Sequence, residues 1–149
     1  MKRLLETALL LSLLALAACS GKPETGPATV RWDKVSCARC IMAVSDHAFS
    51  AQIRGGATGQ KTKVYFFDDL GCAVLWLEKQ AWHDDPRTEM WVNDYQGDDK
   101  WLDAFKAYYV PGQVTPMDYG LGAESDSTAG ALNYEQAVVE IHTRETELH

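Results

Sequence analysis

The sequence has no apolar run long enough to cross a membrane as a helix, which takes about 20 residues. Its longest such run covers residues 8–18 and is interrupted only by Ser12. Lys2 and Arg3 precede the run, and small residues end it. A positive start, a short apolar stretch and small residues are typical of a secretory signal peptide. We therefore expect residues 1–18 to be a signal peptide.

The end of this segment, Leu16-Ala17-Ala18-Cys19, resembles the lipobox of bacterial lipoproteins. In those proteins the cysteine is lipidated and becomes the first residue of the mature chain. We expect Cys19 to carry the several acyl chains that a stable anchor needs, because one chain binds only reversibly. By this resemblance the protein faces the periplasm from a bacterial membrane, and Ser20 favours the outer one. An ordinary signal peptide and a plain transmembrane anchor are the alternatives.

An excess of basic residues is also missing. The chain has 14 Lys and Arg against 21 Asp and Glu, a net charge of −7. Removal of the expected signal peptide takes away Lys2, Arg3 and Glu6 and changes this to −8. An acidic surface repels phosphate groups, which excludes nucleic acid and adsorption to anionic lipid. We expect contact with the membrane through the lipid anchor alone.

The common catalytic signatures are absent as well. There is no phosphate-binding glycine loop, no serine–histidine–aspartate signature, no second C-x-x-C and no H-x₃₋₅-H. A structural zinc site of the usual kind is thereby excluded, and covalent haem attachment is excluded because no histidine follows Cys40. The paired aspartates at 68–69, 84–85 and 98–99 fit turns and helix caps. We expect a protein that is not an enzyme.

What the sequence does contain is a tether followed by one domain. Residues 19–29 are rich in Gly, Pro, Ser and Thr and predict a flexible, lipidated linker. The domain covers residues 30–149. Alternation and β-branched residues predict strands over 47–54, 61–67 and 88–95. Helical spacing of Leu70, Ala73, Val74, Leu77 and Ala81 predicts a helix capped by Asp68 or Asp69.

A second, weaker unit follows the first strand–strand–helix–strand unit. We expect a short helix over 101–107, a strand over 108–110, a loop over 120–130 and a helix beginning at Asn133, with frayed final residues. The predicted fold class is α+β with mostly antiparallel sheets. It consists of two small ββαβ-like modules packed as one compact unit.

Three cysteines remain in the domain when Cys19 carries lipid: Cys37, Cys40 and Cys72. An odd number in an oxidising compartment leaves one thiol free, paired with another chain, or bound to a ligand. Cys37 and Cys40 form a C-x-x-C that fits a disulfide, a redox pair, a metal site or core. We expect burial for Cys72, with a redox or metal role as the alternative. Arg39 should favour the thiolate of Cys40.

Methionine discriminates between the metals. A thioether is a poor ligand for zinc, magnesium or calcium and a good ligand for soft Cu(I). Met42 lies two residues after Cys40, so in extended backbone their side chains share a face. Met117 lies in a loop between proline and glycine, whereas Met90 is expected in the core. Core packing of Met42 stays open. The histidines are expected in solvent, although one of them is able to complete a copper site.

The ordered segments C-x-x-C-x-M, FSAQI, FFDDLGC, VNDYQGDDKWLDAFKAYYVPG and TPMDYGLGA cover residues 30–123 and resemble the NosL-type lipoproteins. The resemblance implies a Cu(I)-binding periplasmic lipoprotein associated with nitrous oxide reductase gene clusters, which supplies copper for the enzyme's copper–sulfide centre. It implies a fold of two small α/β modules, similar to the organomercurial lyase accessory domain. The ligands that it implies are Cys40, Met42 and Met117, with Cys37 at a less uniform position.

The chain departs from that pattern at two positions near the expected ligands. Ile41 replaces a glycine between cysteine and methionine, and Asp118 replaces a small residue after Met117. The sequence beyond Gly122 matches poorly.

Our main hypothesis is a Cu(I) metallochaperone that serves nitrous oxide reductase or its copper-loading machinery, as a monomer or weak dimer. One alternative is a lipid-anchored thiol-disulfide oxidoreductase that uses Cys37 and Cys40. Another is a non-catalytic assembly lipoprotein with a structural disulfide.

Overall fold

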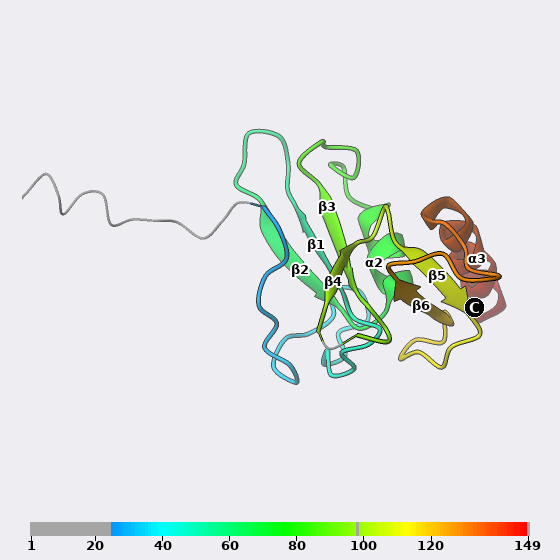
Figure 1. Ribbon diagram of the computed structural model, residues 1–149. Coiled ribbons are helices and arrows are strands. Elements are labelled where there is room, and N and C mark those ends of the chain that lie inside the picture. Colours follow the sequence, from blue (N-terminus) through cyan, green and yellow to red (C-terminus); the bar gives the residue numbers. More distant parts are fainter. Residues whose placement is uncertain (1–24, 98, 149) are drawn as a thin grey trace, which may run out of the picture.

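The computed structural model describes residues 25–97 and 99–148 (Figure 1). The expected signal peptide, the expected lipidation site Cys19 and the first part of the expected tether lie outside the described residues. None of the helices in the described part is both long and apolar enough to span a membrane.

A four-stranded antiparallel sheet forms the larger half of the fold. Its strands are β1 (Ala51–Gly55), β2 (Lys63–Phe67), β3 (Glu89–Asn93) and β4 (Trp101–Asp103), in the order β2-β1-β3-β4. Within this sheet Ile53 lies opposite both Tyr65 and Met90. All five residues of β1 are buried, so both faces of the central strand are covered.

Different parts of the chain cover the two faces of β1. Ala51 and Ile53 belong to the core that α2 (Leu70–Leu77) completes. The alternate residues, Gln52 and Arg54, point to the other face. There Gln52 exchanges hydrogen bonds with the backbone of Ala28, and the Arg54 Nε donates to the Gly26 carbonyl at 3.0 Å. Residues 26–28, expected to be flexible tether, are therefore held on the sheet.

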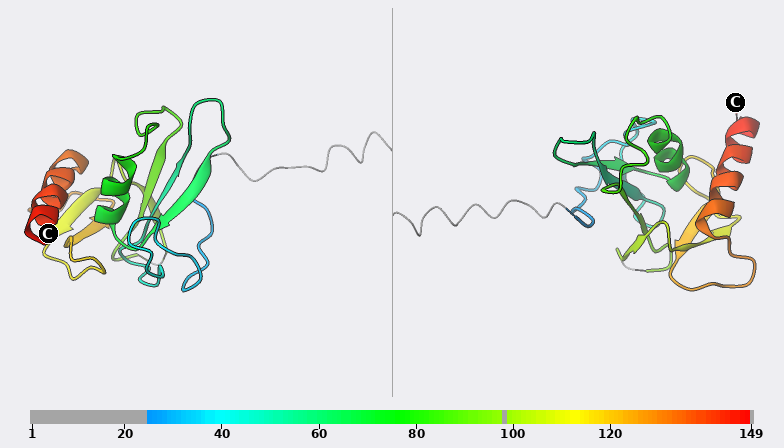
Figure 2. Two further views of the ribbon diagram at one scale, coloured as in Figure 1. Left: turned by 180° about the vertical axis from the view of Figure 1, so that it is seen from behind. Right: turned by 90° about the horizontal axis from the view of Figure 1, so that it is seen from above.

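The smaller half consists of a two-stranded antiparallel sheet and a long helix. Strand β5 (Tyr108–Pro111) pairs with β6 (Leu121–Glu124), and α3 (Tyr134–Leu148) lies on their side of the molecule (Figure 2). Tyr109 and Ile141 are fully buried in the core that both halves share. The Tyr95 amide donates to the Ala123 carbonyl at 2.8 Å and joins the two sheets.

The α+β class, the antiparallel sheets and the first ββαβ unit are confirmed. The expected helix over 101–107 is wrong. Residues Trp101–Asp103 form β4, because Leu102 pairs with Val92 at the open edge of the larger sheet. The Asp103 carboxylate then accepts the Phe105 amide and begins a turn.

The expected loop over 120–130 is wrong at its start, where β6 is a fully buried strand. Gly122 permits this burial, since a Cβ there would lie 2.7 Å from the Tyr95 ring. Several boundaries also differ from those expected. His47 lies in a turn before β1, α2 ends at Leu77, and α3 continues to Leu148.

Candidate metal centre

Four side chains gather at the N-terminal end of α2. The sulfur atoms of Cys37, Cys40 and Cys72 and one carboxylate oxygen of Asp68 all lie within 4.8 Å of one another. With metal–sulfur bonds of about 2.3 Å, two sulfurs on one ion lie about 3.8 to 4.6 Å apart. We call these four residues the thiol cluster. Its size fits a single metal ion.

The members of the thiol cluster differ in exposure. Cys37, Cys72 and Asp68 are buried, whereas Cys40 is only half-buried. Cys40 is therefore the sulfur through which an ion or a partner's ligand reaches the cluster from solvent.

The C-x-x-C lies in a tight hairpin loop that ends at Met42. The Cys37 amide donates to the Met42 carbonyl at 2.8 Å, and the Ile41 amide donates to the Cys37 carbonyl at 3.0 Å. Ala38 donates to the Phe66 carbonyl at 2.9 Å, which fixes the loop against β2. The residue in the first turn of a helix is instead Cys72. The C-x-x-C thus differs from the strand-to-helix arrangement typical of redox motifs.

Ile41 closes this loop in a left-handed conformation. Its φ is 69°, and the residue is 71% exposed. A side chain with a branched Cβ rarely adopts this region, and the cost is about 1–2 kcal/mol per residue. Glycine adopts it without strain. The backbone therefore explains why glycine suits the position between cysteine and methionine.

Asp69 connects the thiol cluster to the loop that carries Met117. Its Oδ1 accepts the Gly71 amide at 3.0 Å and caps α2, as predicted. Its Oδ2 accepts the Met117 amide at 3.1 Å and the Thr115 hydroxyl at 2.5 Å. One buried carboxylate thus holds the Met117 backbone beside the helix end where Asp68 and Cys72 lie. Burial raises the pKa of Asp69, and these hydrogen bonds oppose that shift.

Asp68 has a different role from the cap considered for it. Its carboxylate oxygens lie 3.2 and 3.4 Å from the Cys40 sulfur, which donates its S–H to them. Asp68 thereby accepts a hydrogen bond from the Cys40 thiol instead of capping α2.

The structure brings two of the four predicted ligands together, Cys37 and Cys40. Met42 is 50% exposed beside them. Met117 is partly buried and packs against the core, although its loop position indicated a methionine outside the core. The ligand roles of Met42 and Met117 stay predictions. Met90 is buried in the core, as expected.

The protons of the thiol cluster are distributed unequally. A hydrogen bond from the Cys72 thiol lowers the pKa of Cys37, and the same bond together with burial raises the pKa of Cys72. Burial raises the pKa of Cys40. These shifts favour a thiolate at Cys37 over one at Cys40 or Cys72. A bound metal ion removes the proton from a coordinating thiol, which changes this balance.

Arg39 supplies positive charge next to the thiol cluster. Its Nη1 lies 3.9 Å from the Cys72 sulfur and donates to the Tyr119 hydroxyl at 2.9 Å. Its Nη2 is paired with Glu145 of α3. The expected support for the Cys40 thiolate is thus directed at Cys72 instead. The same contacts fasten the C-x-x-C loop to α3.

From the sequence, we considered Asp68 only as a helix cap and a metal role for Cys72 only as an alternative. The available signal was their spacing of four residues across the start of α2, which brings two side chains to one side of a helix end. Among the described histidines, three are paired with carboxylates outside the cluster: His47 with Asp99, His83 with Asp84, and His142 with Glu78. His149 lies outside the described residues.

Comparison with known proteins identifies a similar solved structure and a matching family. The crystal structure of the copper chaperone NosL from Shewanella denitrificans aligns with a TM-score of 0.52 and 19% sequence identity, over 82% of this chain and 89% of that one. At this identity the likeness shows the fold. No curated protein matches the chain. The NosL family model matches residues 28–129, more than half of the sequence, and the chain therefore belongs to the NosL family.

Proposed function

We propose that this protein is a chaperone that binds Cu(I) as cargo at the thiol cluster and releases it to another protein. The observation that carries the proposal is three cysteine sulfurs within 4.8 Å of one another, one of them half-exposed, in a chain of the NosL family. Sulfur ligands favour Cu(I) over magnesium or calcium. The structural neighbour from Shewanella denitrificans is itself a copper chaperone.

Cys40 is the ligand on which binding depends most. Its sulfur is the accessible one, and its thiol donates a hydrogen bond to the Asp68 carboxylate at 3.2 Å. The Cys37 thiolate binds from the buried side. Met42 and Met117 complete the site with thioether ligands, which are neutral and bind Cu(I) weakly enough for exchange. Cys72 supports Cys37 by donating a hydrogen bond to it.

The recipient is nitrous oxide reductase or its copper-loading machinery, and the chaperone itself performs no catalysis. This assignment rests on family membership, as does the periplasmic location. The lipid anchor at Cys19 rests on the lipobox-like sequence. The acidic net charge supports docking on a basic surface of the recipient.

An anaerobic Cu(I) competition titration tests the binding site. We expect Cys40→Ser and Met117→Leu to weaken binding, and Cys72→Ser to retain most of it because serine still donates a hydrogen bond to Cys37. Met90→Leu is the matched methionine control, since Met90 is buried in the core and outside the cluster. If Cys40→Ser and Met117→Leu both bind like the wild type, this site is wrong. If Cys72→Ser loses as much affinity as Cys40→Ser, Cys72 is a ligand.

A thiol-disulfide oxidoreductase is the second candidate, favoured by the lowered pKa of Cys37 beside Cys40. The exposures argue against it. An attacking thiol needs both thiolate character and access, whereas Cys37 is buried and the accessible Cys40 has a raised pKa. Turnover of a dithiol substrate that Cys37→Ser abolishes would favour the oxidoreductase.

A further inference from the structure

We propose that Ile41 is the residue through which this chaperone docks on the protein that accepts its copper. The inference rests on the proposed function and adds the contact surface to it. Three features of Ile41 carry the argument: its exposure, its backbone conformation and its position next to Cys40.

Ile41 gains nothing from the interior of its own chain. It is 71% exposed, so it contributes little to the core. Its φ of 69° is strained for a β-branched residue, and glycine or asparagine would fit the same loop with less strain. An exposed side chain that carries backbone strain without internal packing points to a contact outside the molecule.

The position of Ile41 suits a transfer surface. It follows Cys40 directly, and Cys40 is the only half-buried sulfur of the thiol cluster. Met42, the next residue, is 50% exposed and extends the apolar surface. During ligand exchange the incoming ligand must reach the ion beside Cys40. A contact at Ile41 would hold the acceptor there and exclude water from the exchange.

The loop is also rigid enough to present this residue. Hydrogen bonds between Cys37 and both Ile41 and Met42 close it, and Ala38 fixes it to β2. Arg39 fastens it to Tyr119 and Glu145. A preorganised contact loses little entropy on binding. A short-lived complex of small area depends on one or two such side chains.

The partner that fits this surface is a protein whose Cu(I) ligands lie at the edge of an apolar recess with a basic rim. The recess receives the side chain of Ile41. The basic rim complements a chaperone with 21 acidic and 14 basic residues. Of the two recipients named under the proposed function, we take nitrous oxide reductase itself as this partner.

The test compares copper transfer from Ile41→Asn and Ile41→Val, using the full chain in detergent. Asparagine tolerates the left-handed conformation and removes the apolar contact, whereas valine keeps both the apolar surface and the β-branched shape. Val139→Asn on α3 is the matched surface control, because Val139 is 66% exposed on another element. Each Cu(I)-loaded variant is mixed anaerobically with copper-free nitrous oxide reductase, and separately with the small chelator bicinchoninate.

We expect Ile41→Asn to keep its Cu(I) affinity and its rate of release to bicinchoninate, and to load the reductase about tenfold more slowly. Ile41→Val and Val139→Asn should load it like the wild type. Equal loading by Ile41→Asn would overturn the inference and leave the proposed function intact. Absence of loading by the wild type would overturn the docking partner, and absence of Cu(I) binding would overturn the proposed function itself.

Discussion

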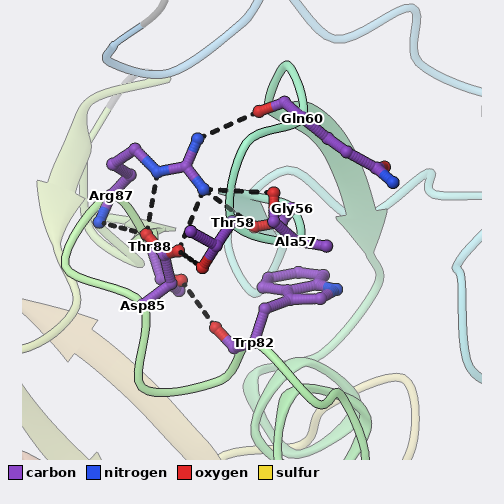
Figure 3. Close-up of polar contacts among 8 residues, drawn as sticks. All are labelled: Gly56, Ala57, Thr58, Gln60, Trp82, Asp85, Arg87 and Thr88. Atoms are coloured by element: carbon purple, nitrogen blue, oxygen red, sulfur yellow. Dashed lines mark hydrogen bonds and ion pairs between the residues drawn. The ribbon is translucent and has the colours of Figure 1, made fainter.

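Two polar clusters of this protein differ in how completely the chain itself satisfies their hydrogen-bonding groups. The first lies between the β1–β2 turn and the segment before β3 (Figure 3). There Arg87 donates to both oxygens of Asp85 at 2.9 Å and to the carbonyls of Gly56, Ala57 and Gln60. The Thr58 hydroxyl donates a further hydrogen bond to the Asp85 carboxylate. We call this group the arginine lock.

The thiol cluster is the opposite case. Three of its four members are thiols, which are weak donors and weak acceptors. Cys40 donates to Asp68 at 3.2 Å, and the Cys72 sulfur lies 3.9 Å from Arg39. The arginine lock has strong, charge-assisted bonds and leaves little for a ligand to add. The thiol cluster has soft donors whose strongest partner is a metal ion. We therefore infer that the arginine lock contributes stability and that the thiol cluster serves binding.

The largest expected effect is on binding, at Cys40. We expect Cys40→Ser to lower Cu(I) affinity on the order of 100-fold or more, since it replaces the accessible thiolate by a hard hydroxyl. The free energy of unfolding of the copper-free protein should change by less than about 1 kcal/mol, because the residue is half-buried. Competition titration and urea unfolding measure the two quantities. If Cys40→Ser loses stability and keeps its Cu(I) affinity, Cys40 serves stability and not binding.

The next effect is at Asp69, which contributes to both stability and binding. Asp69→Ala leaves the Gly71 and Met117 amides and the Thr115 hydroxyl without their acceptor. We expect a loss of about 2–4 kcal/mol of unfolding free energy. It should also weaken Cu(I) binding, because the Met117 loop is released from the end of α2. Unchanged Cu(I) affinity in the folded variant would show that Met117 is not a ligand.

A smaller effect is expected in the arginine lock. Arg87→Ala should lower the free energy of unfolding by about 1 kcal/mol and leave Cu(I) affinity unchanged. Arg87 holds the pKa of Asp85 below its usual range. A depressed aspartate pKa stabilises the fold above the unfolded value of about 3.9, and this contribution is lost as the pH falls further. The stability gap between wild type and Arg87→Ala should therefore narrow below about pH 4. A difference in unfolding free energy that does not change with pH would show that Arg87 does not act through the ionised Asp85 carboxylate.

Sequence patterns predicted the elements that depend on local spacing. Alternation and β-branched or aromatic residues predicted β1, β2 and β3. Asp69 was one of two predicted caps for α2, because capping needs only the residues that follow it. Residues 101–107 and 121–124 were assigned wrongly because their state depends on distant partners. Leu102 is in a strand because it pairs with Val92 of β3. Gly122 is in a strand because it pairs with β5 and lies against the ring of Tyr95.

The site followed the same rule. Cys37 and Cys40 are close in sequence and were predicted together. Asp68 and Cys72 joined them only through the folding of β2 and α2 against the hairpin loop. The strain at Ile41 was visible only as an unexpected residue at a position where glycine is common. Its cause, a positive φ, required the backbone.

The smallest expected effect concerns that backbone and compares Ile41→Gly with Ile41→Ala. In helices and strands alanine is more stable than glycine by about 0.5–1 kcal/mol, because glycine loses more entropy on folding. In the left-handed region alanine still has a Cβ that clashes with the following carbonyl, and glycine has none. At φ 69° the order should therefore invert, with Ile41→Gly the more stable variant by about 0.5–1 kcal/mol in urea unfolding. Both variants lose the exposed side chain, so its removal cancels in the comparison. Greater stability of the alanine variant would place Ile41 outside the left-handed region in solution, and would remove the strain on which its assignment as a docking residue depends.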